Sequence, residues 1–518
     1  MAMEIHVRIP AEDLDYPDRV RKHVLQSAGL PDDHQRIDIL KRSLDARSKT
    51  IFYQLRVRVS PANTPETPPP TPEARNVSGA PEVCIIGAGP AGLFAALALI
   101  DAGYKPVIFE RGKNVRSRRR DLAQLNRGGE VNPHSNYCFG EGGAGTYSDG
   151  KLYTRSKKRG SIDEVLRWLI AFGASADIAV DAHPHIGTNR LPKIIENIRE
   201  FIISCGGEVH FEHHLDHLEF NTSGIQRLRF NQTLWKKTNR VILATGHSAR
   251  DIFTLLHTVG IEIEAKPFAL GVRVEHPQAF IDQTQYHCPV KPDYLPPSSY
   301  SVVHRDATRS AYSFCMCPGG IIAPCATAHG EVVTNGWSPS KRNNPFANSG
   351  IVVEIQPSDY QTSQRSPLDA MHFQAQVEQR AWEIGGGNLK APAQRLTDFM
   401  KHKVSDRLPV SSYHPGTTSA DLREVLPDFV YATLINGFKA FDRKMRGYIH
   451  EEAVVHATES RTSSPVRIPR DSSTLEHPRV PGLYPAGEGA GYAGGIVSAA
   501  MDGMRIARVI ATEKSNSK

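Results

Sequence analysis

Three glycines near residue 90 have the spacing of a phosphate-binding turn. Gly87, Gly89 and Gly92 follow the apolar run 83–86, which has the β-branched composition of a buried parallel strand. The first glycine permits a tight turn, the second lets the backbone approach a pyrophosphate, and the third lets a helix pack closely on the strand. Helix-forming residues from 91 to 102 would then point N–H groups and a helix dipole at the phosphates.

An acid stands where a dinucleotide site needs one. A second strand, 106–109, is followed by Glu110 and Arg111, and an acid about 20 residues beyond the glycines can bind a ribose diol. The alternative is a glycine-rich turn in another kind of α/β protein, which the combination of strand, helix and acid disfavours. The sequence therefore predicts a Rossmann-like dinucleotide site.

Later glycine-rich segments distinguish FAD from NAD as the dinucleotide. Residues 136–151 combine glycines with small and hydroxyl side chains, strand 240–243 leads into Ala-Thr-Gly at 244–246, and the run 487–496 opens a C-terminal helix. A helix N-terminus can stabilise the negative charge that builds up on a flavin during reduction. Since a simple NAD dehydrogenase needs no second glycine site, these segments favour FAD. The residues predicted to bind it are Gly87, Gly89, Pro90, Ala91, Gly92, Glu110, Arg111, Gly142, Gly143, Ala144, Gly145, Ser148, Val209, Ala244, Thr245, Gly246, Gly487, Glu488, Gly495 and Ile496.

Six longer stretches resemble a largely uncharacterised bacterial family of FAD-dependent dehydrogenases, often labelled NAD(FAD)-utilising dehydrogenases. They are residues 139–152, 244–251, 266–277, 312–320, 459–465 and 485–503. The resemblance implies an FAD fold of the glutathione-reductase type with an inserted substrate domain, and it implies no particular substrate. Because no second strand–glycine–helix signature is found, we expect no separate NAD(P) domain. If NADH or NADPH is the donor, it is expected to bind transiently near the flavin.

The predicted fold class is α/β, with five segments along the chain. Residues 1–60 read as strand, helix, strand, strand, which suits a small α+β domain, and the proline-rich stretch 61–80 suits a semi-rigid linker. Residues 81–260 form the first part of the FAD-binding domain. Residues 261–448 are expected to be an inserted α+β substrate domain, and residues 449–518 the second part of the FAD-binding domain.

The flavin itself carries the hydride, so the protein needs to supply only orientation, charge stabilisation and one proton. Three residues are candidates for these catalytic roles. Arg461, just before the last glycine segment, is the favoured active-site cation. Arg273 and His276 could clamp an anionic substrate, or be an ordinary strand arginine and loop histidine. His247 follows Ala-Thr-Gly and could line the flavin, although local hydrogen bonding is the plainer interpretation.

A C-x-C pair, Cys315 and Cys317, has two interpretations. The pair could be redox-active, or it could pack against the cofactor cavity, and buried inert cysteines are the commoner case. No metal site is expected, because no second ligand pair with suitable spacing follows.

The composition of the 518 residues predicts a soluble cytoplasmic protein. The chain has 40% hydrophobic residues, no apolar run long enough for a bilayer, no signal-peptide pattern, and seven scattered cysteines that do not form a disulfide framework. The leading hypothesis is an oxidoreductase with a small-molecule substrate and no membrane partner. The net charge of +7 and the separate first domain motivate one alternative, an RNA-modifying flavoprotein. The second alternative is a scaffold protein that binds a flavin without turning over a substrate. The sequence predicts no particular oligomeric state.

Overall fold

A five-stranded parallel sheet organises the first part of the molecule. The computed structural model describes residues 2–31, 35–65, 71–154, 160–305, 309–360 and 365–516. The sheet has the order β22-β10-β4-β5-β6, with all neighbours parallel. Its strands are β4 (Glu82–Ile86), β5 (Lys105–Phe109), β6 (Glu208–His210), β10 (Val241–Leu243) and β22 (Leu483–Pro485). Because parallel strands share a carboxyl edge, the segments that follow β5 and β22 meet at this edge although they lie far apart in the chain.

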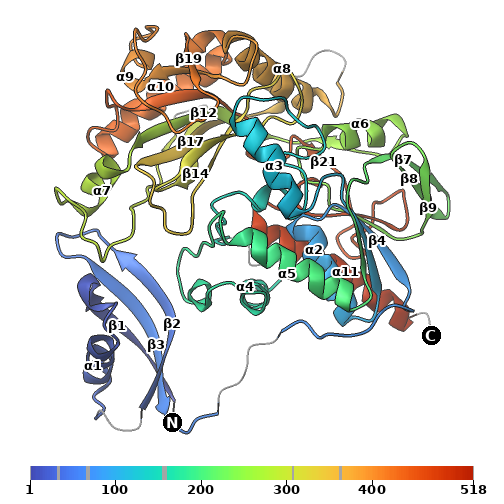
Figure 1. The fold of residues 1–518 in the computed structure, drawn as a ribbon, viewed down its shortest axis with the longest axis horizontal. Coiled ribbons are helices and arrows are strands. Elements are labelled where there is room, and N and C mark those ends of the chain that lie inside the picture. Colours follow the sequence, from blue (N-terminus) through green and yellow to red (C-terminus); the bar gives the residue numbers. More distant parts are fainter. Residues whose placement is uncertain are drawn as a thin grey trace.

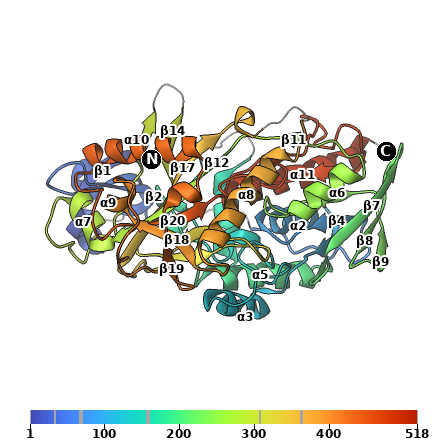
Figure 2. The same cartoon turned by 90° about the horizontal axis from the view of Figure 1, so that it is seen from above.

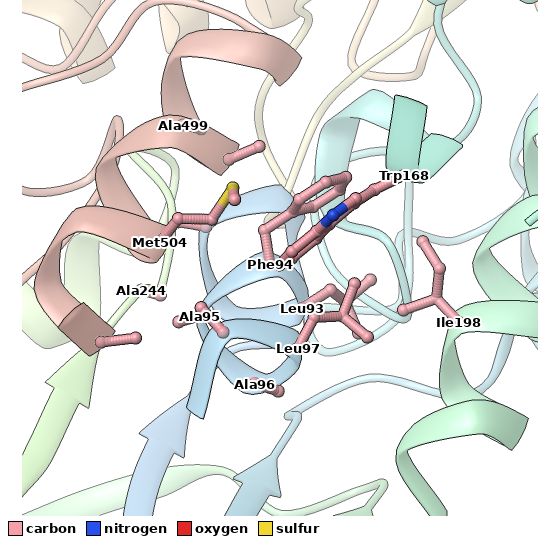
Figure 3. Close-up of a cluster of buried hydrophobic side chains, with 14 of the residues drawn as sticks. Leu93, Phe94, Ala95, Ala96, Leu97, Trp168, Ile198, Ala244, Ala499 and Met504 are labelled. Carbon is pink, nitrogen blue, oxygen red and sulfur yellow. The ribbon is translucent and has the colours of Figure 1, made fainter. Parts of the chain in front are cut away.

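Helix α2 (Pro90–Asp101) is the most buried helix of this unit. Every residue from Ala91 to Ile100 is buried, as expected for a helix that is apolar on all sides. Helix α11 (Ile496–Asn516) packs along it so closely that a Cβ on Gly503 would lie 2.0 Å from the Ala91 carbonyl oxygen. On another side, Phe94 stacks on Trp168 of α4 (Ile162–Ala171), with ring centroids 6.0 Å apart (Figure 3).

Further elements surround this sheet. Helices α3 (Val115–Asn126), α5 (Leu191–Ser204) and α6 (Arg250–Thr258) belong to the same part of the chain. An antiparallel sheet of β7 (Leu215–Asn221), β8 (Gly224–Phe230) and β9 (Leu234–Lys237) was not among the expected elements. Phe230 of β8 stacks on Phe109 of β5 with centroids 4.2 Å apart, which ties the small sheet to the large one.

A seven-stranded mixed sheet forms the second unit, in the order β13-β14-β17-β12-β20-β18-β19. The strands are β12 (Phe268–Pro277), β13 (Val303–Arg305), β14 (Ser310–Cys317), β17 (Phe346–Ile355), β18 (Ala391–Arg395), β19 (Thr417–Ser419) and β20 (Val454–Glu459). Strand β20 belongs to this sheet, so the unit continues beyond residue 448, where the sequence placed its end. Helices α8 (Asp369–Ile384) and α10 (Asp428–Lys444) lie over the sheet (Figure 1 and Figure 2), and the hairpin β15 (Ile321–Pro324)–β16 (Thr334–Trp337) packs against its strands. Smaller elements are α7 (Gln278–Tyr286), α9 (Leu396–Phe399), β11 (Glu264–Ala265) and β21 (Val466–Arg467).

The N-terminal unit is a three-stranded antiparallel sheet with one helix, set beside the rest of the molecule (Figure 1). It comprises β1 (Met3–Pro10), α1 (Pro17–Ala28), β2 (Gln35–Asp45) and β3 (Phe52–Pro61), in the predicted order of strand, helix, strand, strand. Arg42 of β2 forms ion pairs with Asp177 and Asp181 of the unit built on the parallel sheet. The predicted linker follows β3, and its residues 66–70 lie outside the described part of the chain.

No helix in the described residues combines the length and the apolar composition that a membrane span requires.

Gly503 tests the contact between α2 and α11. Alanine normally stabilises a helix interior relative to glycine, but a Cβ at this position would overlap the Ala91 carbonyl oxygen at 2.0 Å. We expect Gly503→Ala to destabilise the protein by about 1–3 kcal/mol, the usual range for overpacking, measured as a lower melting temperature. Gly79→Ala is the matched control, because a Cβ there would meet nothing within 4 Å. An unchanged or raised melting temperature for Gly503→Ala would contradict the close packing.

Candidate functional site

A cavity of about 420 Å³ lies where the two large units meet. One part of its wall comes from the glycine segments around the parallel sheet, at residues 86–91, 143–151, 244–249, 486–488 and 494–496. Another part comes from the second unit, through Phe314, Cys315, Asn335, Gly336, Arg461 and Thr462. The predicted glycine-rich segments are thus brought together, and they face side chains from the mixed sheet.

The phosphate turn has the geometry that its glycine spacing predicts. Gly87 has φ +105°, a conformation that glycine adopts without strain, and a Cβ there would lie 2.4 Å from the Ala244 carbonyl oxygen. Gly89 is extended and precedes Pro90, the first residue of α2. Two helices, α2 and α11, therefore begin at the cavity wall, and their N-termini favour an anion there.

Glu110 lies at the predicted place, and its carboxylate already accepts three backbone hydrogen bonds. Oε2 accepts from the Ala88 N–H at 2.8 Å, and Oε1 accepts from the N–H groups of Gly112 and Gly140 at 2.9 and 3.0 Å. A carboxylate has about four acceptor positions, so one remains on Oε2 for a ribose hydroxyl. Glu110 therefore joins the phosphate turn to the 136–145 loop as well as lining the cavity.

A buried arginine that the sequence analysis did not single out holds the 136–145 loop. Arg118 of α3 is fully buried and donates to four carbonyl oxygens of this loop, those of Asn136, Tyr137, Glu141 and Gly143, at 2.8 to 2.9 Å. Burial lowers the pKa of Arg118, and within the described part of the chain no carboxylate is among its hydrogen-bond partners. The arginine thus fixes the loop through backbone dipoles alone. In the sequence Arg118 belongs to the basic run 116–120, which is typical of a solvated face and does not distinguish this position from its neighbours.

Asp502 holds the last glycine segment in the same way. It is fully buried in α11, accepts a hydrogen bond from the Gly487 N–H at 2.9 Å, and forms an ion pair with Arg470 at 2.6 Å. Arg470 also donates to the Pro485 carbonyl oxygen at 2.8 Å. The turn after β22 is therefore fixed from behind by one ion pair.

His247 lines the cavity beside the Ala-Thr-Gly turn as a neutral side chain. Burial, with help from nearby cations such as Arg461, lowers the pKa of His247 to about 4. Its Nε2 lies 3.6 Å from Glu488, whose pKa burial raises. Its Nδ1 is buried and has no hydrogen-bond partner among the described residues.

Three of the residues predicted to bind the cofactor do not line the cavity. Gly92 packs α2 on the turn, since a Cβ there would lie 2.0 Å from the Gly87 carbonyl oxygen. Gly142 turns behind the wall, where a Cβ would lie 1.9 Å from Oγ1 of Thr146. Val209 pairs with Ile108 on the edge strand β6. The other predicted cofactor residues all line the cavity.

Arg461 lines the cavity as predicted, but its positive charge is already paired, which corrects the expectation that it serves as an active-site cation. Its guanidinium donates to Thr327, Glu331 and Glu378 at 2.6 to 3.1 Å. Although burial alone would raise the pKa of Glu378, Arg250 and Arg461 lower it to about 2. Two arginines therefore balance two glutamates, and little positive charge is left for a ligand.

Arg273 and His276 are also wrong as substrate contacts, because neither lines the cavity. Arg273 is fully buried and pairs with Glu459 at 2.7 Å and with Asn348 at 2.7 Å. His276 is buried, its Nε2 lies 2.8 Å from the Tyr448 carbonyl oxygen, and its ring stacks on Phe280. Both residues lie on β12, and only their residue types had suggested a substrate-binding role.

The cavity fits an FAD by three observations. Two helix N-termini line it, as noted for α2 and α11. A Cβ at Gly246, Gly494 or Gly495 would meet nothing within 4 Å, so these backbones leave open space toward a ligand. His247 Nδ1 and Asp149 Oδ1 are buried polar atoms of lining residues with no partner among the described residues. The glycine segments would hold the dinucleotide, and the flavin would supply two-electron chemistry where they face the second unit.

Comparisons with known proteins agree with an FAD site. Residues 82–124 match an FAD binding domain, residues 267–462 match the family "FAD-dependent protein, C-terminal domain-like", and residues 1–60 match a domain of unknown function. The class of the protein is therefore that of FAD-dependent proteins. An uncharacterized protein of Clostridium beijerinckii is 40% identical over 499 residues, which cover 92% of this chain and 93% of that protein. The chain therefore belongs to the same family as this uncharacterized relative.

Solved structures resemble the chain only distantly. Tetracycline destructase Tet(51) has 12% identity and a TM-score of 0.33, with 85% of this chain and 83% of that chain covered. The quinol fumarate reductase subunit FrdA of E. coli has 13% identity and a TM-score of 0.36, with 85% and 70% covered. Likenesses at this level add nothing to the argument about function.

Gly89 tests the phosphate turn as a ligand contact. A Cβ at Gly89 would meet no protein atom closer than 3.9 Å, yet it would stand at the cavity wall beside the N-terminus of α2. We expect Gly89→Ala to leave the melting temperature of the FAD-free protein unchanged and to weaken FAD binding at least about tenfold, or about 1.4 kcal/mol, measured by flavin fluorescence titration. Gly79→Ala, far from the wall, should bind FAD as the wild type does. Equal affinity for Gly89→Ala would contradict this placement.

The buried histidine His276 predicts a loss of stability in acid. Burial lowers its folded-state pKa from 6.5 to about 4, so between these pH values the unfolded chain binds the extra proton, and stability falls as pH decreases. The full contribution is about 3 kcal/mol. We expect His276→Gln, which keeps a donor for the Tyr448 carbonyl, to make the fall in melting temperature between pH 7 and pH 4 shallower. The exposed His6→Gln should leave that fall unchanged. An unaltered pH profile of stability in His276→Gln would contradict the burial of a neutral imidazole at this position.

Proposed function

We propose that the protein is an FAD-dependent oxidoreductase with an FAD domain of the glutathione-reductase type, transferring a hydride between the flavin and a small-molecule substrate. The observation that carries the proposal is the shared cavity. Its glycine segments come from the nucleotide-binding unit, and its Phe314, Asn335 and Thr462 come from the mixed-sheet unit. A substrate held by the second unit would therefore lie next to the cofactor.

The chain's own residues would orient the reactants and set the charge around them. The α11 N-terminus, which begins at Ile496, would stabilise negative charge. His247 stays neutral at physiological pH and offers an imidazole nitrogen without adding a positive charge. Arg461 and its glutamates form a neutral, rigid part of the wall, which suits positioning better than anion binding.

The donor of electrons is proposed to be a nicotinamide that binds transiently at this cavity. The strand–glycine–helix signature occurs once in the sequence, so a nicotinamide would have no binding domain of its own and would share this cavity. The substrate is proposed to be a small molecule, with no role for a membrane or for nucleic acid.

The test begins with the absorption spectrum of the purified protein and the identification of the released cofactor. We expect a flavin spectrum, FAD on release, and bleaching when NADH or NADPH is added without oxygen. A colourless protein that also fails to take up FAD would overturn the proposal. Bleaching by dithionite but by neither nicotinamide would remove the nicotinamide donor. Salt-sensitive retention on RNA would instead favour an RNA-modifying enzyme, and a flavin that no reductant can reduce would favour a scaffold role.

A further inference from the structure

Two cysteines and a lysine from distant parts of the chain meet at one side of the cavity. The Sγ atoms of Cys315 and Cys317 lie 4.0 Å apart, and Nζ of Lys151 lies 3.7 and 3.8 Å from them. Cys315 and Lys151 line the cavity, whereas Cys317 is fully buried. Hydride transfer to a flavin requires none of these groups, so their convergence calls for another explanation.

The backbone is specially shaped at the cysteine pair. The register between β14 and β17 shifts between Phe314 and Cys317, which gives β14 one extra residue, and Cys315 has φ +48°. In a regular strand, residues two apart are separated by roughly 7 Å, so the bulge brings the sulfurs nearer than the strand alone would. Bulges and left-handed residues other than glycine are concentrated at functional sites.

The charges around the pair leave room for one thiolate. Among the described residues, the charged groups around it are Lys151, Arg273 and Arg342, which are positive, and Asp149 and Glu459, which are negative. Arg273 pairs with Glu459 at 2.7 Å, while Lys151 and Arg342 share Asp149 at 3.7 and 2.9 Å. One positive charge is therefore uncompensated, and it lies beside the sulfurs.

Hydrogen bonding singles out Cys315 as the thiolate. A hydrogen bond from the Cys317 thiol, together with Lys151 and Arg273, lowers the pKa of Cys315 well below its usual value, against the effect of burial. The pKa of Cys317 is raised by its interaction with Cys315 and by burial. Burial would lower the pKa of Lys151, but the two sulfurs and Asp149 outweigh it, so Lys151 stays charged. The member of the pair that lines the cavity is thus the more acidic one.

We propose that Cys315 and Cys317 form a redox-active dithiol that reduces a low-molecular-weight disulfide entering the cavity. The Cys315 thiolate attacks one sulfur of the substrate disulfide, which breaks and leaves as a thiolate that takes up a proton. Cys317 then loses its proton and attacks Sγ of Cys315, which releases the second thiol and leaves a Cys315–Cys317 disulfide. One substrate disulfide becomes two thiols, and two protein thiols become one disulfide, so electrons and protons balance.

This reaction involves only sulfur atoms, so it goes beyond the proposed hydride transfer and can fail or succeed independently of it. Lys151 acts as a positioning residue that stabilises the attacking thiolate. A buried cysteine pair without reactivity would need neither a lysine beside both sulfurs nor a cysteine at the cavity wall.

The experiment is anaerobic incubation of the full-length protein with oxidised glutathione, followed by intact mass and tryptic mapping. Trypsin releases residues 310–341 as one peptide that holds Cys315, Cys317 and Cys325, so fragmentation within it identifies the bonded pair. We expect the loss of two hydrogen atoms and a bond between Cys315 and Cys317. Wild-type protein that keeps all its thiols free, or that forms a bond to Cys325 instead, would overturn the proposal.

Variants separate the two cysteine roles. Cys317→Ser should keep glutathione on Cys315 as a mixed disulfide, and Cys315→Ser should not react in this peptide. Lys151→Met should react about tenfold more slowly at neutral pH, with the pH midpoint of Cys315 alkylation moved toward that of an ordinary thiol. Cys288→Ser, which lies away from the cavity, should behave as the wild type does. An unchanged pH midpoint in Lys151→Met would contradict its role, and alkylation of the wild type gives this midpoint even if a cysteine variant does not fold.

Discussion

The wall around the dinucleotide site is made largely of backbone, and backbone without side chains has to be held in shape by groups buried behind it. Arg118 does this most clearly, since it is fully buried and donates to four carbonyl oxygens of one loop. Glu110 is an acceptor instead of a donor: its carboxylate accepts hydrogen bonds from three N–H groups, which belong to the phosphate turn, the segment after β5 and the same loop. The glycines make close approach possible, and the buried charges decide which conformation the loops adopt.

Such an arrangement makes the site sensitive to its hidden supports. A buried charge that loses its partners is strongly unfavourable, so a loop held by Arg118 cannot relax without leaving that charge unsatisfied. Asp502 couples the last glycine turn to α11 and, through the close packing of Gly503 on Ala91, to α2. The two helix N-termini that face the cavity are therefore fixed relative to each other by one ion pair and one backbone contact.

Local signals in the sequence predicted a large part of this fold. Strand β4, the glycine turn and α2 were predictable because their spacing and apolar composition are set within a few neighbouring residues. Most of the predicted glycine contacts also line the cavity, because a backbone contact depends only on the local segment.

The side chains of the site were harder to predict, because their environment depends on residues far away in the chain. Arg273, His276 and Arg461 are chemically suitable, but their partners lie from about 80 to more than 180 residues away, and these partners neutralise or bury them. In the sequence Arg118 is one arginine among several in the basic run 116–120. The small sheet β7–β9 was missed, and no local signal marked its role against β5.

The two walls of the cavity differ in how their polar groups are held. On the glycine side, Glu110 accepts backbone N–H groups and burial lowers the pKa of His247, so this wall offers mainly fixed dipoles and a neutral imidazole. On the side of the second unit, Arg461 and Arg273 are each balanced by glutamates. Among the described residues, the uncompensated positive charge beside the sulfurs belongs to Lys151 and Arg342 with their shared Asp149. Because Lys151 follows the glycine loop and the cysteines lie on the mixed sheet, this charged corner exists only when both units are in contact.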